Sequence, residues 1–167
     1  KTVESARRDA PRRQIMPYEL VDIAGSRLVI DGGLEEQKQA AATLRAHYGD
    51  RVLADVSIGL KDVDVGARTE RKTKEGGYRA IHFSIDQAGK RVEIQLRTRR
   101  QDVHGEYFHD VFMYPDFDND PAFTRYADVM SEHYYRLDRG LKSKPPKPPE
   151  IAYRYPKGLL PDDPLGG

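Results

Sequence analysis

The clearest hydrophobic pattern in the chain is a strict alternation over residues 78–86 and again over residues 91–98. Apolar side chains take every second position, namely Ile81, Phe83, Ile85, Val92, Ile94 and Leu96. A period of two is typical of β-strands with one buried face. The four residues 87–90, Gln-Ala-Gly-Lys, join the two runs and predict a β-hairpin. Its second face is polar and carries Tyr78, His82, Glu93, Gln95 and Arg97.

The segment before this hairpin predicts two strands separated by one helix. Residues 22–30 and 51–58 are short runs rich in β-branched and apolar residues, which favours strands. Residues 34–48 are rich in Ala, Leu, Glu, Gln and Lys and contain no glycine or proline, which favours a helix. Gly49 follows directly and is suited to the C-terminal cap of that helix.

The rest of the chain predicts a loop, two helices and a tail. Residues 66–77 are polar, non-periodic and flanked by glycines, which indicates a mobile loop. Residues 101–113 and 121–141 have helical composition, and the second begins at a proline suited to a first helical turn. Most of the 11 prolines fall in residues 142–167, so this tail is expected to be extended or only loosely docked. We therefore expect one domain over residues 1–141, followed by the tail.

Size and composition bound the class of protein. A chain of 167 residues has the length of a single domain and can bury a modest core. No apolar run approaches the roughly 20 residues of a membrane span, so we expect a soluble protein without a membrane partner. The absence of cysteine excludes disulfides, thiolate nucleophiles and thiolate zinc sites, and leaves the redox compartment open.

The net charge of +1 hides a segregation of charge along the chain. Residues 1–13, 68–79 and 90–100 are each net positive, whereas residues 101–120 contain six acids and neither lysine nor arginine. Three basic segments that converge in a fold would form an anion site. Solvated faces of helices and hairpins are the commoner explanation of such runs.

Two carboxylates lie in predicted strands close in sequence to these cations. Asp22 opens one strand, and Glu93 lies mid-strand between Val92 and Ile94. Hard carboxylate oxygens hold Mg²⁺ and arginine forks hold phosphates, so the combination suits Mg²⁺ with a nucleoside polyphosphate. For either carboxylate alone, a solvated or salt-bridged side chain is the simpler interpretation. The sequence contains neither a P-loop nor a Rossmann motif, and no paired histidines of common zinc sites.

The hairpin also carries a specific family resemblance. Glu75-Gly-Gly-Tyr-Arg-Ala-Ile-His82 and Val92-Glu-Ile-Gln-Leu-Arg-Thr98 resemble the Gly-Tyr-Arg-Ser-Ile-His and Val-Glu-Ile-Gln-Ile-Arg-Thr motifs of the RelA/SpoT alarmone synthetase domain. Upstream, Asp22-Ile-Ala-Gly-Ser-Arg27 resembles the family's Asp-Ile-Ala-Gly-x-Arg strand, and Lys1-Thr-Val-Glu-Ser5 resembles part of its ATP-phosphate motif. Downstream, residues 101–109 resemble a Trp-Ala-Glu-x-x-His helix, with His104 at the common tryptophan.

The resemblance implies an α+β fold, a nucleotidyltransferase-like mixed β-sheet flanked by helices. It implies transfer of the β,γ-pyrophosphate of ATP to the 3′-hydroxyl of a purine nucleotide, with release of AMP. Asp22 and Glu93 would hold Mg²⁺, and Glu93 could also accept the proton of the attacking hydroxyl. The residues implied at ATP are Lys1, Ser5, Arg7, Arg8, Arg12 and Arg27, the last stacking on the adenine. Those implied at the acceptor are Arg71, Lys72, Lys74, Tyr78, His82, Gln95 and Arg97, with Tyr78 stacking on the base.

Two departures from the family pattern concern ATP. The arginine that usually precedes the motif lysine by two residues has no counterpart before Lys1, so we expect a domain excised from a longer protein. Asp9 stands where a lysine is common, which leaves Arg7, Arg8 or Arg12 to replace it.

The resemblance leaves the acceptor and the biological role open. GDP or GTP is the family default, whereas ADP, ATP or the 3′ end of tRNA serve toxic relatives. Nothing in the sequence resembles the family's hydrolase domain, and an unopposed synthetase would drain ATP. We therefore expect a toxin or secreted effector that acts in the cytoplasm and has an immunity protein. A catalytically silent nucleotide-binding regulatory module is the remaining alternative, and the intact set of Asp22, Tyr78 and Glu93 argues against it.

Overall fold

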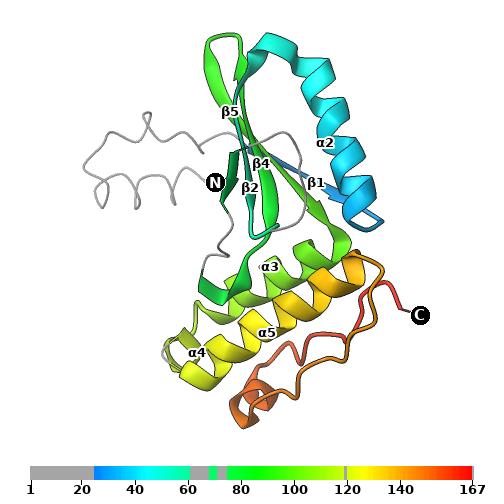
Figure 1. Cartoon of the computed structure of the whole chain (residues 1–167). Helices are drawn as coiled ribbons and strands as arrows, with labels where there is room; N and C mark the ends of the chain where they lie inside the picture. The colour runs from blue at the N-terminus through cyan, green and yellow to red at the C-terminus, as the bar shows by residue number, and fades with distance from the viewer. Residues whose placement is uncertain (1–24, 61–67, 71–74, 119, 167) are drawn as a thin grey trace.

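The structure, a computed structural model, describes residues 25–60, 68–70, 75–118 and 120–166. Figure 1 shows a β-sheet with one long helix along its side and a layer of helices across its lower end. The predicted α+β class, a mixed sheet flanked by helices, is confirmed. Within the described ranges, no helix is both long and apolar enough to cross a membrane.

Five strands form one mixed sheet in the order β1-β5-β4-β2-β3. Their bounds are β1 Gly25–Ile30, β2 Val52–Ile58, β3 Arg68–Glu70, β4 Ala80–Gln87 and β5 Lys90–Thr98. The pairs β4/β5 and β2/β4 are antiparallel, whereas β1/β5 and β2/β3 are parallel. The strand predicted over residues 51–58 is confirmed, and that over 22–30 is confirmed from residue 25, where the description begins.

The predicted hairpin is confirmed, with a tighter turn than expected. Only Ala88 and Gly89 separate β4 from β5, and both have positive φ, at 54° and 75°. Two such residues in succession are typical of the turns that match the twist of a hairpin. Asp86 Oδ1 accepts a hydrogen bond from Gly89 N at 2.7 Å and supports the turn. The register pairs Phe83 with Ile94 and so places the apolar positions of both strands on one face.

Helix α2, Leu34–Tyr48, covers this apolar face (Figure 1). Its bounds are those predicted, and Gly49 ends it with a φ of 51°. The core between α2 and the sheet consists of Leu34, Ala41, Leu60, Ile81, Phe83, Ile85, Ile94, Leu96 and Tyr135. Because α2 takes the apolar face, the polar side chains of the hairpin project from the opposite one.

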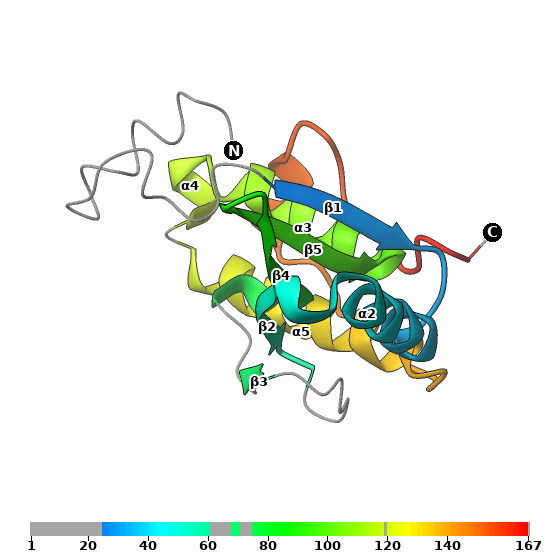
Figure 2. The same cartoon turned by 90° about the horizontal axis from the view of Figure 1, so that it is seen from above.

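The second layer consists of α3 Arg99–Val111, α4 Pro115–Asp118 and α5 Pro121–Asp138. Helix α3 begins two residues before the predicted start because Thr98 caps it, its side chain accepting from Gln101 N at 3.1 Å. Helix α5 begins at Pro121 as predicted and ends three residues early, at Asp138. Figures 1 and 2 show α3 and α5 side by side at the end of β5. Their shared core is aromatic and includes Phe108, Phe117, Phe123, Tyr126 and Tyr134.

Two described parts of the loop predicted over residues 66–77 form regular structure. Three of them form β3, Arg68–Glu70, which pairs with the end of β2. Residues 75–77 form a short 3₁₀ turn that leads into the next strand. Residues 66, 67 and 71–74 lie outside the described part of the chain.

The proline-rich tail is docked more firmly than its composition predicts. Ala152, Tyr155 and Leu160 are buried in the core of the helical layer. The Tyr107 hydroxyl donates to the Gly158 carbonyl at 3.0 Å. The tail contains a 3₁₀ turn at Glu150–Arg154 and shorter turns further along, and these contacts fix it in place. The division into a catalytic domain and a separate tail stays a prediction.

Candidate active site

The face of the sheet opposite α2 carries the polar residues of the alternating pattern. In the β4/β5 pairing, His82 lies opposite Gln95 and Ser84 opposite Glu93. On the other side of β5, the β1 pairing places Arg27 beside Gln95. Paired positions in a sheet point to the same face, so these side chains form adjacent rows.

Along β5, a chain of hydrogen bonds ends at the Glu93 carboxylate. Gln95 Nε2 donates to Glu93 Oε1 at 2.8 Å, and Arg97 Nη2 donates to Gln95 Oε1 at 2.8 Å. Residues two apart on a strand share a face, so the Glu-x-Gln-x-Arg spacing by itself brings these groups together. The Arg97 side chain is 6% exposed and that of Glu93 is 22% exposed. The arginine is thus a buried anchor, and the carboxylate keeps an accessible edge.

A second chain links the same arginine to the same carboxylate through β4. Arg97 Nη2 donates to the Tyr78 hydroxyl at 3.1 Å, which lies 2.7 Å from His82 Nε2. His82 Nδ1 in turn lies 3.3 Å from Glu93 Oε2. Because a guanidinium only donates, the tyrosine oxygen accepts from it, and its proton is available to His82 Nε2. Both chains of contacts therefore lead from Arg97 to the Glu93 carboxylate.

Tyr78 is held as a neutral, oriented ring. The Arg97 Cζ atom lies 4.9 Å from the ring centroid, and the His82 ring meets it edge-on at 5.7 Å. Burial raises the pKa of the Tyr78 phenol, and the nearby Arg97 opposes that shift only in part. The hydroxyl therefore stays protonated at neutral pH and keeps its place in the chain.

Acids of α3 fix the two arginines of the site. Arg27 Nη1 lies 3.1 Å from Asp102 Oδ1 and 2.7 Å from Glu106 Oε1. Arg97 Nη1 lies 3.3 Å and 3.7 Å from the same two oxygens. Gly105 makes this approach possible, because a Cβ there would lie 2.9 Å from Arg97 Nη1. From the sequence, these acids are interpreted only as compensating charge. Their spacing of four on a helix is the signal that could identify them as partners of the arginines.

The structure brings together six of the residues predicted for the site. These are Arg27, Tyr78, His82, Glu93, Gln95 and Arg97. His82, predicted near the acceptor phosphates, lies between Tyr78 and Glu93, and its role at the acceptor stays a prediction. The remaining predicted residues lie outside the described part of the chain: Lys1, Ser5, Arg7, Arg8, Arg12, Asp22, Arg71, Lys72 and Lys74.

One of the two carboxylates predicted to hold magnesium, Glu93, belongs to the described part of the chain. Over the described ranges, no three His, Asp or Glu side chains gather as a metal-binding group. Mg²⁺ at a nucleotide is commonly held by one or two carboxylates together with phosphate oxygens and water. The accessible edge of Glu93 is compatible with such a role, and Asp22 lies outside the described part.

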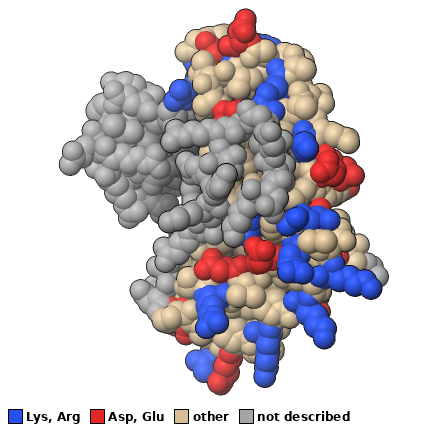
Figure 3. Space-filling view, viewed as in Figure 1, with Lys and Arg blue, Asp and Glu red and all other residues tan. Residues whose placement is uncertain are grey.

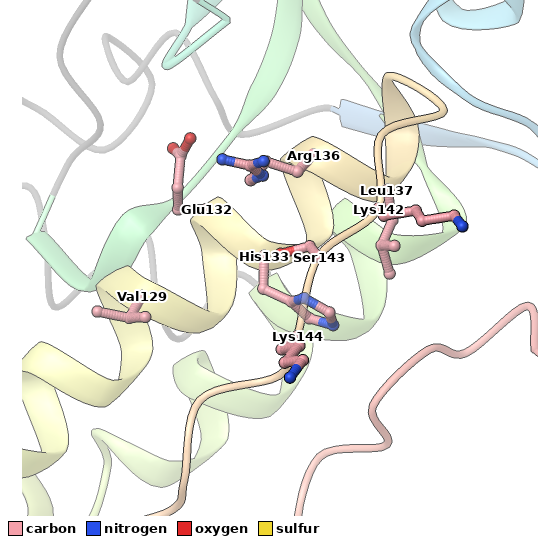
Figure 4. A pocket seen from close by; sticks show the side chains of 8 residues that line it. All are labelled: Val129, Glu132, His133, Arg136, Leu137, Lys142, Ser143 and Lys144. Carbon is pink, nitrogen blue, oxygen red and sulfur yellow. The ribbon is translucent and has the colours of Figure 1, made fainter.

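A groove of about 790 Å³ lies away from this polar face, between α5 and the start of the tail. Figure 4 shows its lining, in which Arg136, Lys142 and Lys144 point in different directions. In the view of Figure 3, Lys and Arg side chains are numerous over the same lower half of the molecule. Because Arg136, Lys142 and Lys144 point in different directions, they form no single anion site.

Comparisons with known proteins place the chain in a family. Residues 1–116 match the model described as the region found in RelA / SpoT proteins. No protein with a curated description matches the sequence.

Solved structures share the fold at low sequence identity. Small alarmone synthetase 1 from Bacillus subtilis, bound to its product pppGpp, has a TM-score of 0.62 at 20% identity over 84% of this chain and 72% of that one. Small alarmone synthetase 2 from the same organism has a TM-score of 0.63 at 20% identity, over 84% and 73%. A GTP pyrophosphokinase family protein from Streptococcus pneumoniae has 0.60 at 19%, over 84% and 69%. With more than half of its length matched by the family model and the fold of small alarmone synthetases, this chain belongs to the RelA/SpoT family.

Proposed function

We propose that the protein is a pyrophosphokinase that transfers the β,γ-pyrophosphate of ATP to the 3′-hydroxyl of a purine nucleotide and releases AMP. The observation that carries the proposal is the Glu93 carboxylate, which accepts a hydrogen bond from Gln95 and contacts His82 beside the oriented Tyr78 ring. That arrangement, in a member of the RelA/SpoT family, is suited to activate a hydroxyl of a nucleotide whose base stacks on the ring.

Glu93 is proposed as the general base. Gln95 donates to Glu93 Oε1 and His82 Nδ1 lies 3.3 Å from Glu93 Oε2, and the carboxylate is exposed enough for a substrate hydroxyl to approach it. As the acceptor oxygen bonds to the β-phosphorus, its proton passes to this carboxylate, and the bond from the β-phosphorus to the oxygen shared with AMP breaks. In such transfers the protein mainly positions the reactants and neutralises charge.

Asp22 and Glu93 are proposed to hold Mg²⁺. The ion would supply positive charge at the β- and γ-phosphates of ATP and offset the charge that develops during transfer.

The two nucleotides are proposed to lie on opposite sides of Glu93. Tyr78 offers its ring to the acceptor base, and Arg27 offers its guanidinium plane to the adenine of ATP. The α3 acids hold the Arg27 guanidinium in a defined place, which supports stacking more than a mobile side chain would. For the acceptor we propose a purine nucleotide, GDP or GTP, or else ADP or ATP. The bound pppGpp of the Bacillus subtilis synthetase supports the guanosine choice in a relative of this fold.

One product analysis tests the proposal. The protein is incubated with ATP, Mg²⁺ and, one at a time, GDP, GTP and ADP, with ATP alone as the fourth acceptor, and products are resolved by mass. We expect AMP together with one nucleotide that has gained a pyrophosphate. Glu93→Gln keeps the shape and removes the base, so its rate should fall by about two orders of magnitude or more while its melting temperature is retained.

Two outcomes would contradict this function. Absence of AMP with all four acceptors excludes a small-nucleotide pyrophosphokinase, and transfer of label from γ-labelled ATP to tRNA would instead identify an RNA 3′ end as the acceptor. A Glu93→Gln variant with full activity would remove the assignment of the base.

The proposed reaction would consume cellular ATP if nothing restrained it, and this suggests a biological role. We propose that the active domain is toxic in the bacterial cytoplasm and that a cognate immunity protein restrains it. Induced expression of the wild-type chain should arrest growth and lower cellular ATP, whereas Glu93→Gln should do neither. Growth arrest by both proteins would separate toxicity from the pyrophosphokinase reaction.

A further inference from the structure

Helix α5 contacts the backbone next to Tyr78, the aromatic ring of the site. Tyr78 follows Gly76 and Gly77, which have φ of 77° and 75°. The Ser131 hydroxyl donates to the Gly77 carbonyl. A Cβ on Gly77 would lie 2.5 Å from the Ser131 Cβ, so a glycine is required both by the backbone and by the contact with α5.

The residue after Tyr78 is Arg79, a buried arginine that donates to three different groups. Arg79 is 5% exposed, and its Nε donates to Ser131 Oγ at 2.9 Å. Its Nη2 donates to Glu132 Oε2 at 2.7 Å, and its Nη1 donates to the Gly59 carbonyl. Burial lowers the pKa of Arg79, but an arginine remains a cation at neutral pH, so the pair with Glu132 persists.

Three residues in one stretch of α5, namely Ser131, Glu132 and Tyr135, contact Arg79. The Tyr135 ring centroid lies 4.3 Å from the Arg79 Cζ atom, one helical turn beyond Ser131. Figure 4 shows Glu132 projecting from one side of α5, whereas His133 projects from the other, toward the tail. The Glu132 side chain is 49% exposed, and its Oε2 atom contacts the arginine.

We infer that Ser131 and Glu132 are positioning residues that hold Tyr78 in register with Glu93 and thereby set the affinity for the acceptor nucleotide. The inference rests on the proposed function. Ser131 bonds the Gly77 backbone carbonyl on one side of Tyr78, and Ser131 and Glu132 hold the Arg79 side chain on the other. A shift of the ring would break its bonds to Arg97 and His82. Neither α5 residue is proposed to contact a substrate, so both would act through Tyr78. Both lie beyond residues 1–116, the part that matches the family model.

Steady-state kinetics tests the positioning role. Ser131→Ala removes the hydroxyl that bonds both Gly77 and Arg79, and Glu132→Gln removes the charge that pairs with Arg79 at nearly unchanged size. We expect the KM for the acceptor to rise about tenfold in each, with kcat and the KM for ATP changed by less than about twofold. Glu150→Gln, which removes a carboxylate that is 93% exposed on the tail, is the matched control and should leave all three constants unchanged. Glu132→Asp, which keeps the charge, should restore part of the affinity for the acceptor.

Amide hydrogen exchange supplies a readout that does not depend on turnover. Both variants should exchange faster over residues 76–79 at an unchanged melting temperature, whereas the Glu150→Gln control should match the wild type. Unchanged exchange there would overturn the anchoring. Faster exchange with equal changes in both KM values, or with a general loss of stability, would overturn the specific link to the acceptor. A wild-type protein that forms no AMP would refute the proposed function, while the exchange data would still decide whether α5 anchors Tyr78.

Discussion

His104 is a buried histidine that the chain keeps neutral. It is 3% exposed within α3, and its Nε2–H donates to the Ala127 carbonyl at 2.9 Å. Burial lowers its pKa to about 4, and the hydrogen bond only partly opposes that shift. A tryptophan is common at this place in the motif that the helix resembles, and an indole also offers a single N–H donor. The imidazole can therefore serve the same packing role, with the added property that it can be protonated.

The neutral state of His104 predicts a stability that falls in mild acid. Between its ordinary pKa of 6.5 and about 4, the unfolded chain binds a proton here and the folded chain does not. The free energy of unfolding therefore decreases as pH falls through this window, by about 3 kcal/mol at most. His104→Gln keeps an N–H donor and cannot be charged, so urea unfolding at pH 6.5 and pH 4 should show a smaller loss for the variant.

The protonation of Asp138, a second buried group, changes the free energy of unfolding in the opposite direction. Its contribution must be separated from that of His104. Burial raises the pKa of Asp138 to about 6, so its protonation on going from about pH 6 to pH 4 favours the folded state. Wild type and His104→Gln share this contribution, and it cancels in their difference. Parallel pH profiles for the two proteins would show that His104 does not carry the acid sensitivity.

At the scale of the element, Gly105 sets how closely α3 approaches the polar face. An alanine in a helix interior is favoured over glycine by up to about 1 kcal/mol, so Gly105→Ala should preserve or raise the stability of α3. Its Cβ would lie 2.9 Å from Arg97 Nη1, so the guanidinium must move away from Asp102 and Tyr78. We expect an unchanged or higher melting temperature together with at least about tenfold lower activity.

The control for α3 is a substitution of an exposed residue on the same helix, one turn beyond Gly105. His109→Ala changes a residue that is 78% exposed in the last turn, and it should leave activity unaltered. Full activity of Gly105→Ala would mean that the position of the Arg97 guanidinium is not critical.

At the scale of the whole molecule, the tail completes the helical layer. Arg100 donates to Asp163 of the tail at 2.8 Å and to Asp138 of α5 at 3.0 Å. The Thr98 hydroxyl, which caps α3, donates to the other oxygen of Asp138 at 2.6 Å. The end of β5, the start of α3, the end of α5 and the tail therefore meet in one network.

Removal of the tail should destabilise the fold. A chain that ends at residue 149 loses the buried Tyr155 and Leu160 side chains and the Asp163 carboxylate. We expect its free energy of unfolding to fall by roughly 3–6 kcal/mol, measured by urea denaturation. A chain that ends at Leu165 keeps these groups and is the matched control. An unchanged stability of the shorter chain would support the loosely docked tail that the composition predicts.

The sequence by itself determined the parts of this protein that depend on local periodicity. The two-residue alternation assigned the faces of β4 and β5, and the Glu-x-Gln-x-Arg spacing placed Glu93, Gln95 and Arg97 on one face. The composition of residues 34–48 and the following glycine gave both ends of α2. These features depend on residues two to four positions apart, whose relative placement follows from the geometry of a strand or a helix.

Only the tertiary structure decided which of these faces meet. The Arg27 pair with Glu106, the Ser131 bond to Gly77 and the Tyr155 side chain in the helical core join residues that are tens of positions apart. The spacing of two acids on one helix face does not identify the distant arginine that they fix, and composition does not decide whether a proline-rich tail is loose or docked. Those outcomes depend on how helices, sheet and tail pack together to bury their apolar faces while keeping buried polar groups hydrogen-bonded.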